Sequence, residues 1–224
     1  MQDRTPALTL VYVDDAIVVL DKPPGLLSVP GRGPDKQDCL SLRVQAQYAD
    51  ALVVHRLDMA TSGLIVMARG VQAQRTLSEA FANRQVNKRY EAVVLGEVEA
   101  PTDDQWRTID LPIGVDWPNR PRRKIDPQAG KSSQTRVQLL QVDAQRQISH
   151  VQLEPLTGRT HQLRLHLQAI GHPLLGDALY APPAVVAMSP RLLLHARDLA
   201  FAHPVSGRTM QFSCQSLRLC GTDL

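Results

Sequence analysis

The sequence predicts an α+β protein with a mixed, mainly antiparallel sheet and flanking helices. Short runs rich in β-branched residues recur along the chain, and turn residues separate them. Segments with helical periodicity fall irregularly among these runs, whereas a doubly wound parallel sheet needs a regular alternation of strand and helix. The chain has 224 residues, of which 43% are hydrophobic and 21% charged, so it is long and apolar enough to bury a substantial core.

The first half of the chain is expected to contain three strands and two helices. Residues 8–15 and 16–22 are β-branched runs that meet at an Asp-Asp turn, and the second run ends before Pro23. Residues 63–68, GLIVMA, have the composition of a short buried strand. Residues 39–48 and 71–84 carry apolar side chains at helical spacing.

The second half is expected to begin with three strands. Residues 88–98 alternate as a strand, and residues 136–143 and 149–156 are expected to form a hairpin. A helix follows, with Thr160 as its predicted N-cap and Gly171 at its end. Strands return from Arg191. No repeat, low-complexity tract or linker interrupts residues 1–224, so we expect a single domain.

The composition excludes several classes of protein. No apolar run approaches the ~18 residues that a membrane span needs. The first twenty residues lack the basic, apolar and small-residue regions of a signal peptide. Cys39, Cys214 and Cys220 form no CxxC pair, which favours reduced cysteines that pack in the core. We therefore expect a cytoplasmic protein that does not associate with membranes.

Positive charge is concentrated in one segment, residues 119–136. The whole chain has a net charge of only +3, and a run of this kind is usually a solvated loop, although it can also bind phosphates. Aromatic residues make up 4% of the chain, which argues against a module that stacks successive bases on an aromatic platform. The segment contains a single acid, Asp126, and six basic residues: Arg120, Arg122, Arg123, Lys124, Lys131 and Arg136.

Common catalytic and metal motifs are absent from the sequence. There is no GxGxxG, GxxxxGK[ST], HExxH or GxSxG pattern, so nucleotide-dependent and zincin chemistry is not indicated. His161, His166 and His172 do not have the spacing of common zinc sites. Hydrogen bonds to the backbone or to RNA explain these histidines better than a metal does, and we expect no metal or organic cofactor.

The string HRLDMATSGL at residues 55–64 is the strongest candidate for a reactive loop. It places Arg56, Asp58 and a Thr-Ser pair just before a buried strand, where a loop can hold a reactive side chain at a sheet edge. Taken alone, Asp58 is more often a turn or cap residue than a catalytic one.

This string closely resembles the HRLDxxTSGL signature of the RluA family of pseudouridine synthases. Further blocks resemble the same family in the same order across nearly the whole chain. They are KPPGLLSVPG from Lys22, KRYEAVV from Lys88, GRTHQLRLH from Gly158, GHPLLGDALY from Gly171 and RLLLHA from Arg191. Residues 111–124 are similar to the branch of the family that modifies both tRNA and 23S rRNA.

The resemblance implies a fold, an activity and a set of site residues. The fold is that of a pseudouridine synthase catalytic domain with a central active-site cleft and, for this chain, no N-terminal S4 domain. Asp58 is implied as the catalytic nucleophile or base, Tyr90 as the active-site tyrosine and Arg164 as the basic partner of the aspartate. The implied substrates are a tRNA anticodon stem-loop and a 23S rRNA stem-loop, bound by a monomer.

The chemistry of uridine isomerisation needs these residue types. The N1–C1′ bond must break, the uracil must rotate, and the ring must rejoin through C5, so an ionised carboxylate has to act while water is excluded. Arg164 would keep Asp58 ionised. Asp58 could attack C1′, remove the 2′ proton to give a glycal, or add to C6 of the base. Tyr90 could stack on the uracil and assist proton removal from C5, or could simply be a core tyrosine.

The target base must leave its stack to reach such a pocket. Arg56 is then placed to fill the gap or hold a phosphate, and a structural ion pair is its alternative role. The other candidates for RNA contact are Arg120, Arg122, Arg123, Lys124, Arg159 and His161.

Two other classes of function deserve comparison. A glycosidase-like hydrolase would need a second carboxylate, for which Asp177 is available. An inert RNA-binding or RNA-folding protein would keep the basic surface without needing Asp58, Tyr90 and Arg164 together. The joint presence of these three residues favours the enzyme.

Overall fold

The computed structural model describes residues 8–99, 105–215 and 217. The chain divides into two compact units. Unit 1 comprises Met1–Asn87 and Ala196–Cys214, and unit 2 comprises Lys88–His195 and Gln215–Leu224. The chain leaves unit 1 within strand β5 and returns to it within strand β11. Unit 1 is therefore discontinuous in sequence.

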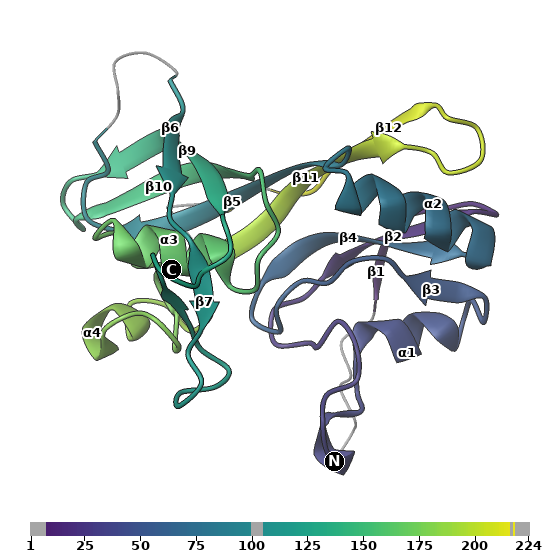
Figure 1. The fold of residues 1–224 in the computed structure, drawn as a ribbon, viewed down its shortest axis with the longest axis horizontal. Helices are drawn as coiled ribbons and strands as arrows, with labels where there is room; N and C mark the ends of the chain where they lie inside the picture. Colours follow the sequence, from purple (N-terminus) through teal and green to yellow (C-terminus); the bar gives the residue numbers. More distant parts are fainter. Residues whose placement is uncertain (1–7, 100–104, 216, 218–224) are drawn as a thin grey trace. The chain divides into compact units, whose positions relative to one another are not determined.

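Unit 1 is a sheet with two helices (Figure 1). Its strands run in the order β1–β2–β4–β11, with β3 paired to β4 and β12 paired to β11. The pairs β1–β2, β2–β4, β3–β4 and β11–β12 are all antiparallel. The elements are β1 (Thr9–Val13), β2 (Ile17–Lys22), η1 (Pro34–Lys36), α1 (Leu40–Gln45), β3 (Ala51–Val53), β4 (Ser62–Arg69), α2 (Val71–Ala82), β11 (Leu194–Ala202) and β12 (Thr209–Ser213).

The core of unit 1 follows from the alternation of side chains along its strands. Ile17 and Val19 of β2 lie in one cluster with Leu64 and Val66 of β4 and with Leu77 of α2. The intervening residues of β2 and β4 are also buried. Because both faces of these strands are covered, they are continuous apolar runs, as expected of a buried strand.

Unit 2 contains a second antiparallel arrangement and a separate hairpin (Figure 1). Its strands run in the order β5–β10–β9–β6, and β7 forms a two-stranded sheet with β8. Ile113 of β7 also forms an isolated antiparallel bridge with Lys131. The elements are β5 (Asn87–Leu95), β6 (Arg107–Asp110), β7 (Ile113–Val115), β8 (Arg123–Ile125), β9 (Gln134–Asp143), β10 (Ile148–Pro155), α3 (Gln162–Ala169) and α4 (Pro183–Val186).

The start of α3 differs from the sequence prediction. The N-cap is His161 rather than Thr160, and His161 adopts a left-handed conformation with φ of 57° and makes no side-chain cap bond. Gly171, with φ of 90°, follows the helix as predicted. The helix is buried over most of its length, so packing rather than capping stabilises it.

The α+β fold with a largely antiparallel sheet is confirmed, and several elements differ in detail. The predicted β9–β10 hairpin is present, whereas α1 and α2 end earlier than expected, at Gln45 and Ala82. The basic run is only partly a loop, because β8 lies within it. Cys39 is fully buried, as expected, and Cys220 lies outside the described residues. Among the described residues, no helix has the length and apolar character needed to cross a membrane.

Candidate active site

The loop that carries Asp58 joins β3 to β4 in unit 1, and its first part is fixed by His55. The Nε2 atom of His55 accepts a hydrogen bond from the backbone N–H of Val66 at 3.1 Å. The imidazole also stacks on the ring of Phe81, with 4.3 Å between centroids. His55 therefore ties the loop both to the sheet and to the end of α2, which is a structural role.

Both neighbours of Asp58 are anchored through their backbones. The hydroxyl of Ser28 donates to the carbonyl of Leu57 at 2.7 Å and accepts from its N–H at 3.1 Å. The carbonyl of Met59 accepts from the N–H of Gly25 at 2.8 Å. Asp58 itself is half-buried, and its carbonyl accepts from the N–H of Thr61. The position of Asp58 is therefore set by segments far from it in sequence.

A buried ammonium group lies beneath this loop. The Nζ atom of Lys22 is within 2.8–3.1 Å of three carbonyl oxygens, those of Pro23, Leu26 and Met59. Burial lowers the pKa of Lys22 from 10.5 to about 8, and the negative charge of Asp58 opposes this shift. Lys22 and Asp58 therefore interact electrostatically across the loop.

Unit 1 carries two of the predicted site residues, Arg56 and Asp58, and Arg56 is the more solvent-accessible of the two. Its side chain is exposed, although it lies only two residues before the half-buried Asp58. An exposed guanidinium beside an anchored carboxylate suits contact with a phosphate or a base.

Arg164 has a partner in unit 2 that sequence reasoning did not assign to it. Its guanidinium binds Asp177 bidentately, with Nε–Oδ2 at 2.9 Å and Nη2–Oδ1 at 2.5 Å. Both side chains are buried. Asp177 also accepts hydrogen bonds from the N–H groups of Leu179 and Tyr180. Its carboxylate is thus committed to holding the arginine and the 177–180 turn, which disfavours Asp177 as a second glycosidase carboxylate.

Tyr180 connects several of the predicted residues of unit 2. Its hydroxyl lies 2.7 Å from Nδ1 of His161 and accepts from the N–H of Arg123 at 2.9 Å. The guanidinium carbon of Arg164 lies 5.3 Å from the centroid of the Tyr180 ring. Unit 2 therefore brings Arg123, His161 and Arg164 together around one tyrosine.

Tyr90 lies on β5, opposite Leu153 of β10, and is half-buried. Asp58 and Arg56 belong to unit 1, whereas Tyr90 and Arg164 belong to unit 2. The ion pair between Asp58 and Arg164 stays a prediction.

The three histidines considered as metal ligands are engaged in separate hydrogen bonds. His166 contacts the Thr135 hydroxyl and the Leu111 carbonyl, each at 2.9 Å, and burial lowers its pKa. His172 contacts the carbonyl of Leu95 at 3.0 Å. With His161 bound to Tyr180, hydrogen bonding within the protein accounts for all three.

The basic run carries less unpaired charge than its sequence indicates. Arg136 pairs with Glu154 at 2.9 Å, and Lys124 pairs with Asp126 at 3.3 Å. Arg120 lies over the ring of Trp117, with 3.7 Å between its guanidinium carbon and the ring centroid. Four cations of the run have no carboxylate within ion-pair distance among the described residues. They are Arg120, Arg122, Arg123 and Lys131.

Three functional side chains escaped assignment from sequence. Lys22 and Ser28 stand in the KPPGLLSVPG block, and Asp177 stands in GHPLLGDALY, where it was considered only as a hydrolase carboxylate. Their roles as anchors had no local signal, because those roles depend on contacts with distant residues. Such contacts arise only from the folded chain.

The fold and these motif-bearing loops are those of an RNA pseudouridylate synthase. The model of the RNA pseudouridylate synthase family matches residues 16–169, which include Asp58, Tyr90 and Arg164. The chain belongs to this family, so it is an isomerase that converts uridine to pseudouridine in RNA.

Curated relatives match almost end to end. The chain is 47% identical over 209 residues, 93% of each chain, to the dual-specificity RNA pseudouridine synthase RluA of Escherichia coli strain K12. It is 43% identical over 211 residues, 94% of each chain, to the protein of the same description from Haemophilus influenzae. Among solved structures, human RNA pseudouridylate synthase domain containing 1 is similar with a TM-score of 0.76 and 28% identity. That match covers 94% of this chain and 84% of the human one.

Proposed function

We propose that this enzyme is a dual-specificity synthase that modifies uridine 32 in tRNA anticodon loops and uridine 746 in 23S rRNA. The observation that carries the proposal is the end-to-end similarity to relatives described as having dual specificity. Because loops that recognise RNA vary between related enzymes, the near-complete coverage matters more than the shared fold.

Asp58 is the proposed nucleophile or base. Three features support this role: Leu57 and Met59 are held by backbone hydrogen bonds, the carboxylate is half-buried, and a buried ammonium group interacts with it. An anchored carboxylate can reach C1′, the 2′ proton or C6 without first ordering its own loop. Tyr90 is proposed to stack on the uracil and assist proton removal from C5, and Arg164 to keep Asp58 ionised.

The RNA is proposed to bind residues from both units. Arg56 would occupy the space left by the displaced base or hold a neighbouring phosphate. The other proposed contacts are Arg120, Arg122, Arg123, Lys124, Arg159 and His161. The enzyme is proposed to act as a cytoplasmic monomer, with residues 1–224 forming one catalytic domain.

The test compares the wild type with Asp58→Asn on unmodified tRNA and 23S rRNA fragments. Tritium release from C5-labelled uridine reports turnover, and carbodiimide-dependent primer-extension stops map the product. We expect release and stops at both positions for the wild type, and neither for Asp58→Asn with RNA binding retained. Stops on one RNA only would reduce the proposal to a single-substrate enzyme, and turnover by Asp58→Asn would remove Asp58 from its role.

A further inference from the structure

We propose that unit 2 contains a pocket for one phosphodiester of the RNA, located between the β7–β8 hairpin and the turn before α3. This inference rests on the proposed function, because it assigns a specific part of the RNA substrate to a specific site.

The pocket is a surface hollow of about 370 Å³. Gly114 and Arg123 line it from the hairpin, Lys131 lines it from the segment before β9, and Gly158 and Arg159 line it from the turn before α3. A Cβ atom built on Gly158 would meet no atom within 4 Å, so the hollow is open on that side, whereas Gly114 packs against the side chain of Asp126. The space is large enough for a phosphate group and its first waters.

The charge of the pocket suits an anion. Three cationic side chains line it and no carboxylate does. One acid, Asp126, packs against the lining residue Gly114, so its charge has to be taken into account. Its carboxylate accepts from the N–H groups of Gln128 and Ala129 and pairs with Lys124, and these contacts lower its pKa. Asp126 therefore stays ionised, but Lys124 compensates its charge, and the three lining cations leave the pocket with an excess of positive charge.

One lining side chain has an unmet hydrogen-bonding requirement. The Nε atom of Arg123 is buried, and it has no acceptor among the described residues. Buried donors in native proteins almost always have a partner, and none of the described carboxylates pairs with this guanidinium either, so the fold leaves its bonding capacity and its charge open to a ligand of the hollow. Phosphate oxygens match a guanidinium better than any neutral acceptor does.

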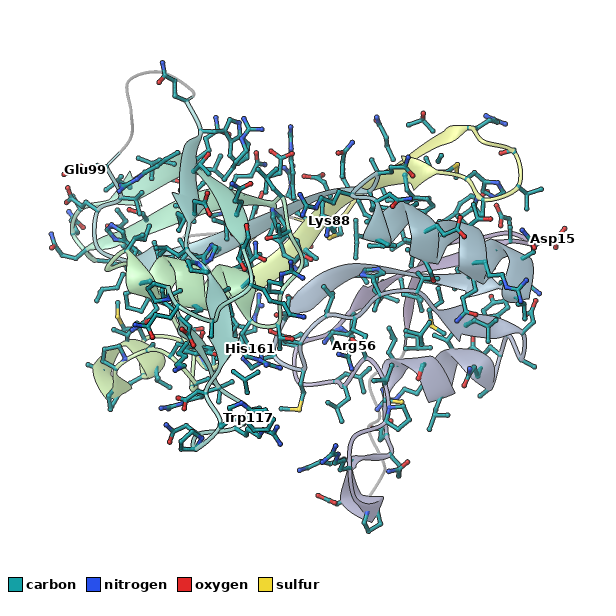
Figure 2. All side chains as sticks on the ribbon, viewed as in Figure 1. Asp15, Arg56, Lys88, Glu99, Trp117 and His161 are labelled. Carbon is teal, nitrogen blue, oxygen red and sulfur yellow. The ribbon has the colours of Figure 1, made fainter. Side chains whose placement is uncertain are left out.

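The surroundings favour a phosphate within RNA over a small free anion. The same hairpin exposes Arg120, Arg122 and Trp117, and 67% of the Trp117 surface is accessible. Figure 2 shows Trp117 on the turn of this hairpin. Cations that continue from the pocket onto an exposed aromatic residue match a polymer that alternates phosphates with stackable bases.

The first test measures RNA affinity as a function of salt for Lys131→Gln. Each phosphate contact contributes about 0.7 to the slope of log K against log salt for single-stranded nucleic acid. We expect the slope of Lys131→Gln to fall by about 0.7 and its affinity to weaken several-fold. Arg75→Gln, which removes an exposed cation from α2, is the matched control and should change little. Equal slopes for wild type and Lys131→Gln would overturn the proposal.

The second test identifies the ligand directly. Single methylphosphonate substitutions are placed along the RNA, and we expect one position that weakens binding to the wild type but not to Lys131→Gln. Gly158→Ala, which fills the hollow without changing charge, should lose sensitivity at the same position. A flat scan together with tight binding of inorganic phosphate would assign the pocket to a free anion and overturn the proposal.

Tritium release by the wild type is measured in the same RNA preparations. If the wild type releases tritium and the scan is flat, the pocket assignment fails alone. If no RNA supports release, the proposed function fails, and the slope comparison still decides whether Lys131 contacts RNA.

Discussion

The side chain of Lys22 shows how a single residue can both anchor a loop and interact with a carboxylate that the loop carries. Its ammonium group satisfies three carbonyls, one of which belongs to the residue after Asp58. Replacing such a cation with an apolar side chain leaves those carbonyls without their donor, which costs about 1–3 kcal/mol for each buried group left unpaired.

The pH dependence of stability should reveal Lys22. Its pKa is about 8 in the folded protein and 10.5 ordinarily, so between these values the unfolded chain binds more protons and stability rises with pH. The difference corresponds to about 3 kcal/mol. We expect the free energy of unfolding of the wild type to rise by about this amount relative to Lys22→Met between pH 7.5 and 10.5, measured by urea titration. A constant difference between the two proteins would contradict the assignment.

The Arg164–Asp177 pair makes a second prediction at this scale. Removing one partner of a buried, bidentate pair leaves a desolvated charge and costs about 3–5 kcal/mol. We expect Asp177→Ala to lower the free energy of unfolding by about this amount, measured by chemical denaturation.

Asp35→Ala, in the exposed turn η1, is the control for this measurement and should change stability by less than ~0.5 kcal/mol. An Asp177→Ala variant as stable as the wild type would show that Asp177 does not hold Arg164.

Strand β4 begins at a point where two backbones come unusually close. Gly63 has φ of 108°, and a Cβ atom there would overlap the backbone of Ala196 in β11. The glycine is therefore required both by its dihedral angle and by the spacing of the two strands.

Replacing Gly63 should lower stability more than replacing a glycine that has a positive φ but no close neighbour. We expect Gly63→Ala to destabilise unit 1 by about 3 kcal/mol or more, measured by thermal or urea unfolding. Gly207→Ala is the matched control, since Gly207 has φ of 70° but open space around it. Its cost should be about 1 kcal/mol. Similar losses for the two variants would mean that the close approach contributes nothing.

The elements predicted from sequence are defined by their own local sequence, whereas the elements that were missed are defined by pairing with other parts of the chain. Strands β2 and β4 are apolar and β-branched, and the β9–β10 hairpin alternates clearly, so local sequence identified them. Strands β7 and β8 have three residues each and surround a turn rich in Pro, Asn and Arg, so only their pairing defines them. The left-handed N-cap at His161 likewise has no local signature, because Thr160 satisfies the usual preference.

The candidate site divides in the same way. Asp58, Tyr90 and Arg164 are predicted as site residues because family motifs carry them, whereas the pairing of Arg164 with Asp177, thirteen residues away in a turn, has no signal in the sequence. The Arg136–Glu154 pair is a contact between neighbouring strands that cancels part of the basic run. Ion pairs across elements depend on register, which composition does not reveal.

At the scale of the whole molecule, unit 1 is assembled from both ends of the chain. Leu199 and Phe201 from β11 belong to the same core cluster as Val66 and Leu77. Translation of the first 87 residues alone leaves that cluster incomplete. Unit 1 therefore requires the return of the chain through β11.

Truncation should expose this dependence. We expect a chain ending at His195 to lose amide protection throughout unit 1 in hydrogen–deuterium exchange, because its core cluster lacks the β11 side chains. A chain ending at Leu217 keeps every described residue and serves as the control. Retained protection in β2 and β4 of the shorter chain would show that residues 9–87 form a sufficient core.

The exposed indole of Trp117 has a spectroscopic consequence. The chain has two tryptophans, and the other, Trp106, is half-buried and lies near Arg89 and Arg136. A Trp106→Phe protein would therefore have one tryptophan, on the turn of the β7–β8 hairpin and open to water. Its emission maximum and its quenching by iodide would report when that hairpin becomes covered, without any attached dye.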